Sequence, residues 1–215
     1  MAEGRFRVAA VQMVSGPEVQ ANLAAAGRLI AQAAGEGAQL VALPEYFCIL
    51  GLRDRDKVDA READGHGPIQ DFLAESAAKN KVWLVGGSAP LECADPDKVK
   101  NSCLVFDAGG RRVARYDKIH LFGFESGTER FQESRSIEPG SEVVTVDAPF
   151  GKLGLSICYD LRFPELYRKM GVVDLILVPS SFTATTGKAH WEMLLRARAV
   201  ENQAYVLAPA QGGHH

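Results

Sequence analysis

Short apolar segments alternate with segments of helical periodicity along this chain, and that alternation limits the fold more than any other feature. Residues 6–13, 40–43 and 82–88 are apolar runs of strand length, the second ended by a proline and the third by glycines. Between them, residues 19–34 and 70–80 carry apolar side chains at helical spacing. Strands separated by helices predict an α/β fold, because helices commonly connect the strands of such a sheet.

The second half of the chain also contains strands and helices, but it begins differently. Residues 101–107 and 112–116 flank a pair of glycines, which is typical of a β-hairpin. A loop-like region, 118–140, follows the hairpin. The remaining expected elements are strands at 143–146, 152–158, 175–179 and 204–208 and helices at 164–170 and 190–202. A hairpin among alternating helices and strands predicts a mixed sheet, and 215 residues without a linker fit one domain.

Composition and charge argue against several classes of protein. The net charge of -3, with scattered basic residues, provides no footprint for nucleic acid. No apolar stretch reaches the roughly 18 residues of a membrane span, and no secretory signal is present, so we expect a cytoplasmic protein. The four cysteines form no CxxC pair, and neither GxGxxG nor GxxxxGK[ST] occurs. These absences predict free thiols and no metal or nucleotide cofactor.

Three polar residues stand where apolar strands end. Glu45 follows residues 40–43 after one proline, Lys118 follows the second hairpin strand, and Cys158 ends the apolar run that begins at residue 152. In open α/β sheets, ligands bind outside the carboxyl ends of strands. We therefore expect these three side chains to converge on one site.

A carboxylate, an ammonium and a thiol together can perform acyl transfer. The thiol attacks an acyl or nitrile carbon as its thiolate, and a half-buried carboxylate of raised pKa can accept the proton. The ammonium stabilises the oxyanion that forms, and the backbone N–H of Tyr159 is placed to add a second donor. The same carboxylate can later activate the water that releases the acyl group.

Each of these residues alone also has a structural interpretation. A cysteine that ends a strand is usually part of the core, a Pro-Glu pair is usually a turn, and an Asp-Lys pair usually caps a strand in solvent. A Cys–His pair with His66, His120 or His190 is also open, although no pattern supports it. Only the joint placement of the three residues favours catalysis.

Longer motifs around the three residues resemble the nitrilase superfamily of carbon–nitrogen hydrolases. The resemblance is carried by VAAVQM, ALPEYF, RYDKIHLF, GLSICYDLRFPELYR and PSSFTATTGKAHWEMLLRARAVENQAYV, and it covers nearly the whole chain. It implies a four-layer α-β-β-α sandwich with two mixed β-sheets. It also implies a general base at Glu45, an oxyanion-stabilising lysine at Lys118 and a nucleophile at Cys158. Glu133 is similar to a further family glutamate that orients the lysine or the substrate, with Glu125 and Glu129 as rivals.

Within the superfamily, the chain looks most like the Nit branch, whose ω-amidases and deaminated-glutathione amidases release ammonia from small dicarboxylic acid monoamides. That likeness implies a small linear amide and water as substrates. It also implies a pocket lined by Tyr159, Phe182, Thr183 and Thr186, in which Arg162 or Arg198 meets a carboxylate. For both arginines, a structural ion pair is the alternative. Nitrile or N-carbamoyl hydrolysis on the same triad, and a non-catalytic binding protein of this fold, are the alternative functions.

The resemblance also bears on assembly and on the end of the chain. Family members are usually dimers or larger, and the helices at 164–170 and 190–202 are candidates for the pairing surface. Leu194, Leu195, Ala197 and Val200 look more like core positions of the second helix. Members normally continue beyond a segment like AQGGHH. We therefore expect a single domain at 1–215 that lacks the C-terminal strands and tail.

Overall fold

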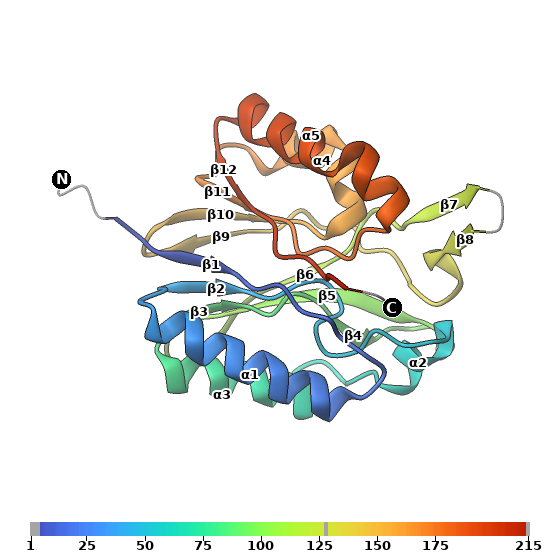
Figure 1. The fold of residues 1–215 in the computed structure, drawn as a ribbon, viewed down its shortest axis with the longest axis horizontal. Helices are drawn as coiled ribbons and strands as arrows, with labels where there is room; N and C mark the ends of the chain where they lie inside the picture. The colour runs from blue at the N-terminus through green and yellow to red at the C-terminus, as the bar shows by residue number, and fades with distance from the viewer. Residues whose placement is uncertain (1–4, 127–128, 214–215) are drawn as a thin grey trace.

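The computed structural model describes residues 5–126 and 129–213, and it has four layers (Figure 1). Helices α1 (Val19–Gly35) and α3 (Pro68–Asn80) cover one sheet, and helices α4 (Pro164–Met170) and α5 (Ala184–Asn202) cover the other. The two sheets face each other between these helical layers. The expected α-β-β-α sandwich with two mixed sheets is therefore confirmed.

The first sheet is formed by the N-terminal half of the chain. Its strand order is β1-β2-β3-β5-β4, and β6 also pairs with β5. Neighbours among β1, β2 and β3 are parallel, whereas β5 is antiparallel to each of its partners. The strands are β1 (Val8–Ala10), β2 (Leu40–Ala42), β3 (Trp83–Val85), β4 (Ala89–Glu92), β5 (Val99–Phe106) and β6 (Arg112–Asp117).

The second sheet has the order β12-β11-β10-β9 and is also mixed. Strand β10 pairs antiparallel with β9 and parallel with β11, and β11 pairs parallel with β12. The strands are β9 (Thr145–Ala148), β10 (Gly151–Leu155), β11 (Leu175–Leu177) and β12 (Tyr205–Leu207). The ends of β2, β6 and β10, which precede Glu45, Lys118 and Cys158, thus lie in two facing sheets.

Alternation along β2 shows how both faces of a sheet are buried. Val41 packs in the core under α1 and α3, whereas Leu40 and Ala42 pack in the core between the sheets. Adjacent side chains of a strand point to opposite faces, so three consecutive apolar residues supply two separate cores. Each fully buried aliphatic side chain contributes roughly 1.5–3 kcal/mol.

Several boundaries differ from the sequence-based expectations. The region 118–140 is not only a loop, because it contains the hairpin β7 (Gly123–Ser126) and β8 (Glu129–Gln132) and the 3-10 turn η1 (Glu133–Arg135). Helix α2 (Asp54–Asp59) and strand β4 were not expected. Helix α5 begins six residues earlier than expected, at Ala184, because Thr183 caps it by accepting a hydrogen bond from the Thr186 backbone.

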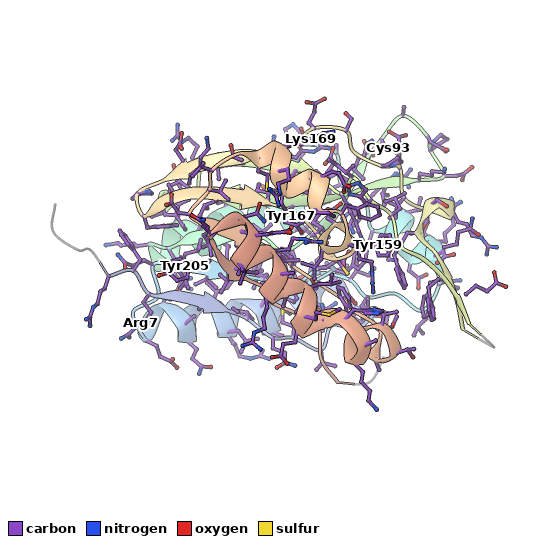
Figure 2. The ribbon with its side chains drawn as sticks, turned by 90° about the horizontal axis from the view of Figure 1, so that it is seen from above. Arg7, Cys93, Tyr159, Tyr167, Lys169 and Tyr205 are labelled. Carbon is purple, nitrogen blue, oxygen red and sulfur yellow. The ribbon has the colours of Figure 1, made fainter. Side chains whose placement is uncertain are left out.

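Helix α5 is less deeply buried than helix α4, whose apolar residues Leu166, Tyr167 and Met170 are all buried. Figure 2 looks onto α4 and α5, with Tyr205 at one side and Tyr159 toward the end of the molecule that carries β7 and β8. Leu194 and Leu195 pack against the core, as expected. The core prediction is wrong for Val200, whose surface is 77% exposed, because it lies on the outward face of α5.

Candidate active site

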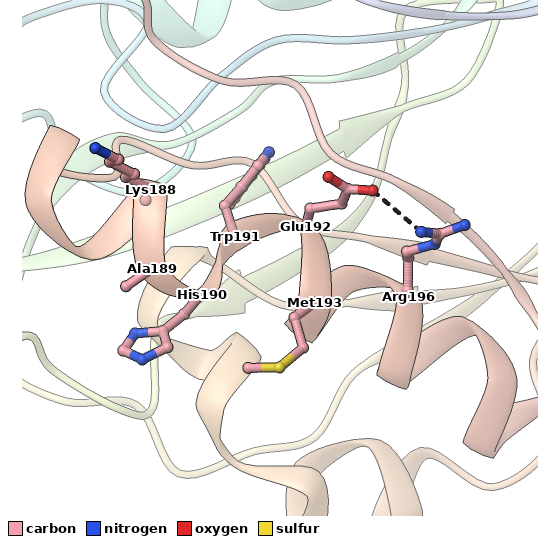
Figure 3. Close-up of a pocket in the computed structure, with 8 residues that line it drawn as sticks. Lys188, Ala189, His190, Trp191, Glu192, Met193 and Arg196 are labelled. Carbon is pink, nitrogen blue, oxygen red and sulfur yellow. Dashed lines mark hydrogen bonds and ion pairs between the residues drawn. The ribbon is translucent and has the colours of Figure 1, made fainter.

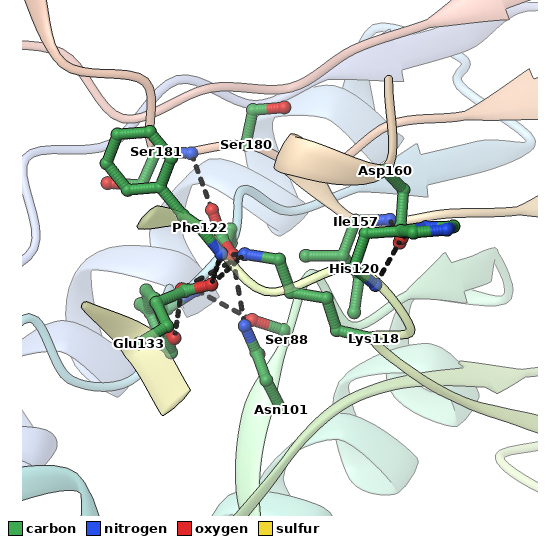
Figure 4. A network of polar contacts seen from close by, with 12 residues as sticks. Ser88, Asn101, Lys118, His120, Phe122, Glu133, Ile157, Asp160, Ser180 and Ser181 are labelled. Carbon is green, nitrogen blue, oxygen red and sulfur yellow. Dashed lines mark hydrogen bonds and ion pairs between the residues drawn. The ribbon is translucent and has the colours of Figure 1, made fainter. Parts of the chain in front are cut away.

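Lys118 lies between two carboxylates in the interior of the protein. Its Nζ is 2.8 Å from Glu45 Oε1 and 2.8 Å from Glu133 Oε2, and only 1% of its side chain is exposed (Figure 4). The backbone of Lys118 extends the β6 pairing, since its N–H donates to the Asn101 carbonyl oxygen. Although burial opposes charge, the two carboxylates hold the pKa of Lys118 well above its usual value, so it is an ammonium at neutral pH.

Glu45 is held at both carboxylate oxygens. Oε1 accepts from Lys118 Nζ and from Asn101 Nδ2 at 3.0 Å, and Oε2 accepts from the Ser181 backbone N–H at 2.9 Å. Burial raises the pKa of Glu45, and the ammonium of Lys118 partly offsets this. A buried carboxylate whose pKa is raised toward neutrality, and which is an interaction partner of the Cys158 thiol, suits a general base.

A strained backbone places Glu45 at this position. The next residue, Tyr46, has φ of 55°, and its N–H donates to Ser88 Oγ at 3.0 Å. Gly87 also has a positive φ of 55°, and a Cβ there would lie 2.0 Å from the Pro44 carbonyl oxygen. Only glycine allows this approach, so the turn after β3 supports the turn that carries Glu45.

Cys158 is the first residue of the 3-10 turn η2 (Cys158–Arg162), not the last residue of a strand. Strand β10 ends at Leu155, and the Cys158 N–H donates to the Pro179 carbonyl oxygen at 2.9 Å. Its φ of 48° lies in the left-handed region, which costs about 1–3 kcal/mol for a residue other than glycine. Such strain is common at active sites, where the surrounding structure enforces it.

The environment of the Cys158 thiol differs from that of the other buried cysteines. Burial and the negative charge of Glu45 raise the pKa of Cys158, whereas the ammonium of Lys118 lowers it. Burial alone raises the pKa of Cys103 to about 12. The resting site therefore holds a thiol beside a carboxylate and an ammonium, and a proton can pass from sulfur to Glu45 when a substrate arrives.

Glu133 completes the buried network. Its Oε1 accepts from Tyr46 OH at 3.0 Å, and its Oε2 accepts from the Phe122 backbone N–H at 2.7 Å. Burial works against ionisation, but the Lys118 ammonium holds the pKa of Glu133 below its usual value. Of its two rivals, Glu125 lies in strand β7, and the side chain of Glu129 lies outside the described residues.

The expected pocket residues surround Cys158. Cys158 lines one pocket together with Phe122, Tyr159, Arg162, Ser181, Phe182, Thr183 and Thr186. All five residues expected to bind substrate are among them, together with Phe122 and Ser181, which the sequence did not single out. The free space is about 10 Å³, which is room for about one water molecule. The side chains of this pocket thus fill most of its inner space.

The two candidate arginines differ in their surroundings. Arg198 is buried, donates to the Leu161 carbonyl oxygen at 3.0 Å and pairs with Glu201 at 2.5 Å, so its role is structural. Arg162 lines the pocket and lies against the rings of Tyr159 and Phe182. Within the described ranges it forms no ion pair, and its Nη1 lies 3.2 Å from Nδ1 of His190.

A larger hollow of about 660 Å³ lies elsewhere, on α5 (Figure 3). Its lining comes from one helix, 187–193 and 196, and includes an ion pair of 3.1 Å between Glu192 and Arg196. A hollow formed by one surface helix does not enclose a ligand, whereas substrate sites usually bury most of theirs. The smaller pocket at Cys158 is the better candidate.

Asp160 was not expected, and it connects the two sides of the site. It is fully buried and accepts from the Ile157 N–H at 2.9 Å and from Tyr116 OH at 2.7 Å. It also accepts from the His120 N–H at 2.9 Å and lies 2.7 Å from His120 Nδ1. His120 thus contacts the nucleophile turn rather than the thiol, and no sequence pattern indicated this pairing.

Gln211 was also missed. Its Nε2 donates to the Glu45 carbonyl oxygen at 3.0 Å and to Ser15 Oγ at 2.8 Å, and its Oε1 accepts from the Ser15 N–H at 3.0 Å. The segment after β12 therefore reaches back to the first sheet and supports the backbone of the candidate base.

Metal binding and membrane insertion are two other functions to consider for the described residues. Across residues 5–126 and 129–213, no three His, Cys, Asp or Glu side chains are grouped so that they could hold a metal ion. In the same ranges, none of the helices has the length and apolar character needed to cross a membrane.

Two amidases are similar to this chain in amino-acid sequence. The chain is 41% identical over 213 residues to the deaminated glutathione amidase of Yersinia enterocolitica, covering 97% of this chain and 74% of that protein. It is 42% identical over 206 residues to an omega-amidase of Danio rerio, covering 94% of this chain and 73% of that protein. These similarities confirm the resemblance to the Nit branch.

A solved structure gives the same result for the fold. The crystal structure of the Caenorhabditis elegans NitFhit protein superposes with a TM-score of 0.86 at 41% identity, covering 100% of this chain and 53% of that chain. This chain thus spans about half the length of that fusion protein. Residues 7–215 match the family described as carbon-nitrogen hydrolase. The chain therefore belongs to the carbon–nitrogen hydrolase family.

Proposed function

We propose that this protein is an amidase that hydrolyses the C–N bond of a small linear amide through an acyl-enzyme on Cys158. The observation that carries the proposal is the buried ammonium of Lys118 between two carboxylates, one of which interacts with the Cys158 thiol. Neighbouring ionisable groups with perturbed pKa values are concentrated at functional sites. The names of the similar amidases support the same reaction.

The first half of the reaction forms a thioester and ammonia. Glu45 accepts the thiol proton as Sγ of Cys158 bonds to the carbonyl carbon, and the carbonyl oxygen becomes an oxyanion. Lys118 and the Tyr159 backbone N–H donate to this oxyanion. When the tetrahedral intermediate collapses, the C–N bond breaks, and the proton on Glu45 passes to the leaving nitrogen.

The second half consumes water. The carboxylate of Glu45 accepts a proton as water oxygen bonds to the thioester carbon, and the same two donors stabilise the second oxyanion. The C–S bond then breaks, the acid product leaves, and the proton on Glu45 returns to the sulfur. Glu133 keeps Lys118 in place and charged through the cycle.

We further propose that the substrate is an ω-amide of a dicarboxylic acid, such as deaminated glutathione. The support is Arg162, which lines the Cys158 pocket and forms no ion pair within the described part of the chain. A guanidinium binds a carboxylate through two parallel hydrogen bonds. Thr183, Thr186 and Phe182 would form the rest of the wall, although both threonines also cap α5.

The free cysteines and the exposed apolar residues of α5 support proposals for the cellular location and the assembly of the protein. All four cysteines are free, and a catalytic thiol requires a reducing compartment, for which we propose the cytoplasm. We also propose a homodimer or larger homo-oligomer that pairs through α4 and α5. Met193 and Val200 on α5 are apolar yet 60% and 77% exposed, and contact with a second copy would bury them.

Ammonia release from deaminated glutathione, a nitrile and an N-carbamoyl amino acid tests the reaction. We expect release from the first alone, and we expect Cys158→Ala to abolish it while circular dichroism stays unchanged. Cys93→Ala is the matched control, because Cys93 lies outside the pocket and should be dispensable. Release from the nitrile or carbamoyl compound would replace the proposed substrate, and turnover by folded Cys158→Ala would refute the mechanism.

A further inference from the structure

The Asp160 carboxylate is the most fully bonded buried anion outside the Lys118 network. It takes four contacts of 2.7–2.9 Å, two at each oxygen: Ile157 N–H and Tyr116 OH at Oδ2, and His120 N–H and Nδ1 at Oδ1. Among the described residues, its one ion-pair partner is the His120 ring. A carboxylate in the interior is stable only when such donors surround it.

These donors come from both sides of the candidate active site. Ile157 directly precedes Cys158, while Tyr116 and His120 each lie two residues from Lys118. Tyr116 OH also accepts from the Ile119 N–H at 3.4 Å, so three residues that flank the lysine are attached to this group. Figure 4 shows Asp160 and His120 at one end of the Lys118 side chain. One carboxylate thus joins the end of β6 in the first sheet to the turn after β10 in the second.

We use the name joint for Asp160 with Tyr116, His120 and the Ile157 N–H. Its position between the two sheets determines which groups it can hold in place. Cys158 and Lys118 follow strands of different sheets, and their separation depends on how the two sheet ends are held together. Cys158 also has a left-handed backbone, which persists only where neighbouring contacts enforce it. The Ile157 N–H bond to Asp160 lies immediately before that strained residue.

We propose that Asp160, with Tyr116 and His120, is a positioning group that sets the placement of the Cys158 sulfur relative to the Lys118 ammonium. This inference rests on the proposed function. None of the three side chains needs to touch substrate, since they act through the two backbone segments that carry the reacting groups. Loosening the joint should slow chemistry and thiol activation while leaving substrate binding nearly unchanged, because a misplaced reacting group costs rate rather than affinity.

Two buried tyrosines provide a matched test. Tyr116→Phe removes the hydroxyl that donates to Asp160, and Tyr167→Phe removes one that donates to Ser156 Oγ at 3.0 Å. Both side chains are fully buried, and both changes leave an intact ring. We expect Tyr116→Phe to lower kcat about tenfold with little change in KM, and Tyr167→Phe to stay within about twofold of wild type.

His120 supplies a rescue experiment. His120→Ala removes the ring donor and should also lower kcat about tenfold, whereas His120→Asn restores a side-chain N–H near the position of Nδ1 and should recover most of the loss. A role in bulk packing alone would not distinguish these two variants so sharply, because His120 also stacks on Phe163 at 3.7 Å and both variants lose that contact.

Iodoacetamide alkylation of Cys158, followed across pH by peptide mass spectrometry, reports on the joint without any substrate. We expect Tyr116→Phe to shift the Cys158 profile to higher pH, and we expect no shift for Tyr167→Phe or for Cys93 in any variant. Equal profiles and equal kcat values for the two tyrosine variants would overturn the positioning role. A shifted profile in a protein that releases no ammonia from any amide would retain the joint and refute the proposed function.

Discussion

Replacing Lys118 by methionine tests the electrostatic balance of the site. Methionine keeps an unbranched chain but removes the charge that lies 2.8 Å from one oxygen of each carboxylate. Removing one partner of a buried ion pair costs about 3–5 kcal/mol, because the other charge is left without compensation. Here two carboxylates are left, and Glu45 and Glu133 are both deeply buried, with 1% and 13% of their side chains exposed.

The loss should depend on pH in a definite direction. Without the ammonium, the pKa of Glu133 is no longer held down, and burial raises the pKa of both carboxyl groups. A group whose pKa is higher in the folded state stabilises the fold below its unfolded pKa, and this contribution is lost as the pH rises. Each proton held only by the folded state changes the free energy of unfolding by about 1.4 kcal/mol per pH unit, so each of the two carboxyl groups can cost Lys118→Met up to about 4 kcal/mol between pH 5 and pH 8.

Urea unfolding, followed by the fluorescence of Trp83 and Trp191 at pH 5 and pH 8, measures this difference. Wild type should change less, because its lysine keeps Glu133 ionised at both pH values. The double variant Lys118→Met/Glu133→Gln should recover stability at pH 8, since it removes one of the two uncompensated charges. A loss below about 1 kcal/mol at pH 8, or the same loss at both pH values, would refute this account of the site.

Three further predictions concern catalysis, folding and specificity. Because burial raises the pKa of Glu45, the acid limb of the kcat/KM profile should have its midpoint above 4.5, and a midpoint below that value would remove Glu45 as the base. Gly87→Ala should lower the free energy of unfolding by about 3 kcal/mol, since the added Cβ would lie 2.0 Å from the Pro44 carbonyl oxygen. Gly35→Ala is the control, because the space around Gly35 is open, and it should not destabilise the protein in the same urea assay. Arg162→Met should raise KM for an ω-amide acid about a hundredfold but leave KM for a neutral amide of similar size nearly unchanged, and equal effects on both would mean that Arg162 does not bind a carboxylate.

The three residues at strand ends could be found from the sequence because the signal is local. Glu45, Lys118 and Cys158 each follow a predicted strand, and ligands of α/β sheets bind outside the carboxyl ends of strands. The family motifs then distinguished them from ordinary turns. Their convergence was an expectation from strand ends, but the individual contacts were beyond sequence reasoning, since the ion pair of Lys118 with Glu45 joins residues 73 positions apart.

Partners that act across the two sheets could not be predicted. Asp160 is one polar residue in a motif rich in them, and its role depends on how β6 faces the turn after β10. Gln211 reaches the Glu45 backbone from 166 residues away, so no local pattern could indicate it. By contrast, the hairpin within 118–140 could have been predicted, because two aromatic residues, Phe124 and Phe131, form a cross-strand pair there.

The bonds of Glu45 also determine when the protein becomes reactive during folding. Its carboxylate contacts come from residues 56, 73 and 136 positions away, and the last of these, Ser181, follows β11 of the second sheet. Contacts of such long sequence separation form late, because the chain must first close large loops. A newly made or partly unfolded chain therefore carries Cys158 without the candidate base and the ammonium beside it. The three groups meet only when both halves have docked, so the proposed acyl transfer is confined to the folded chain.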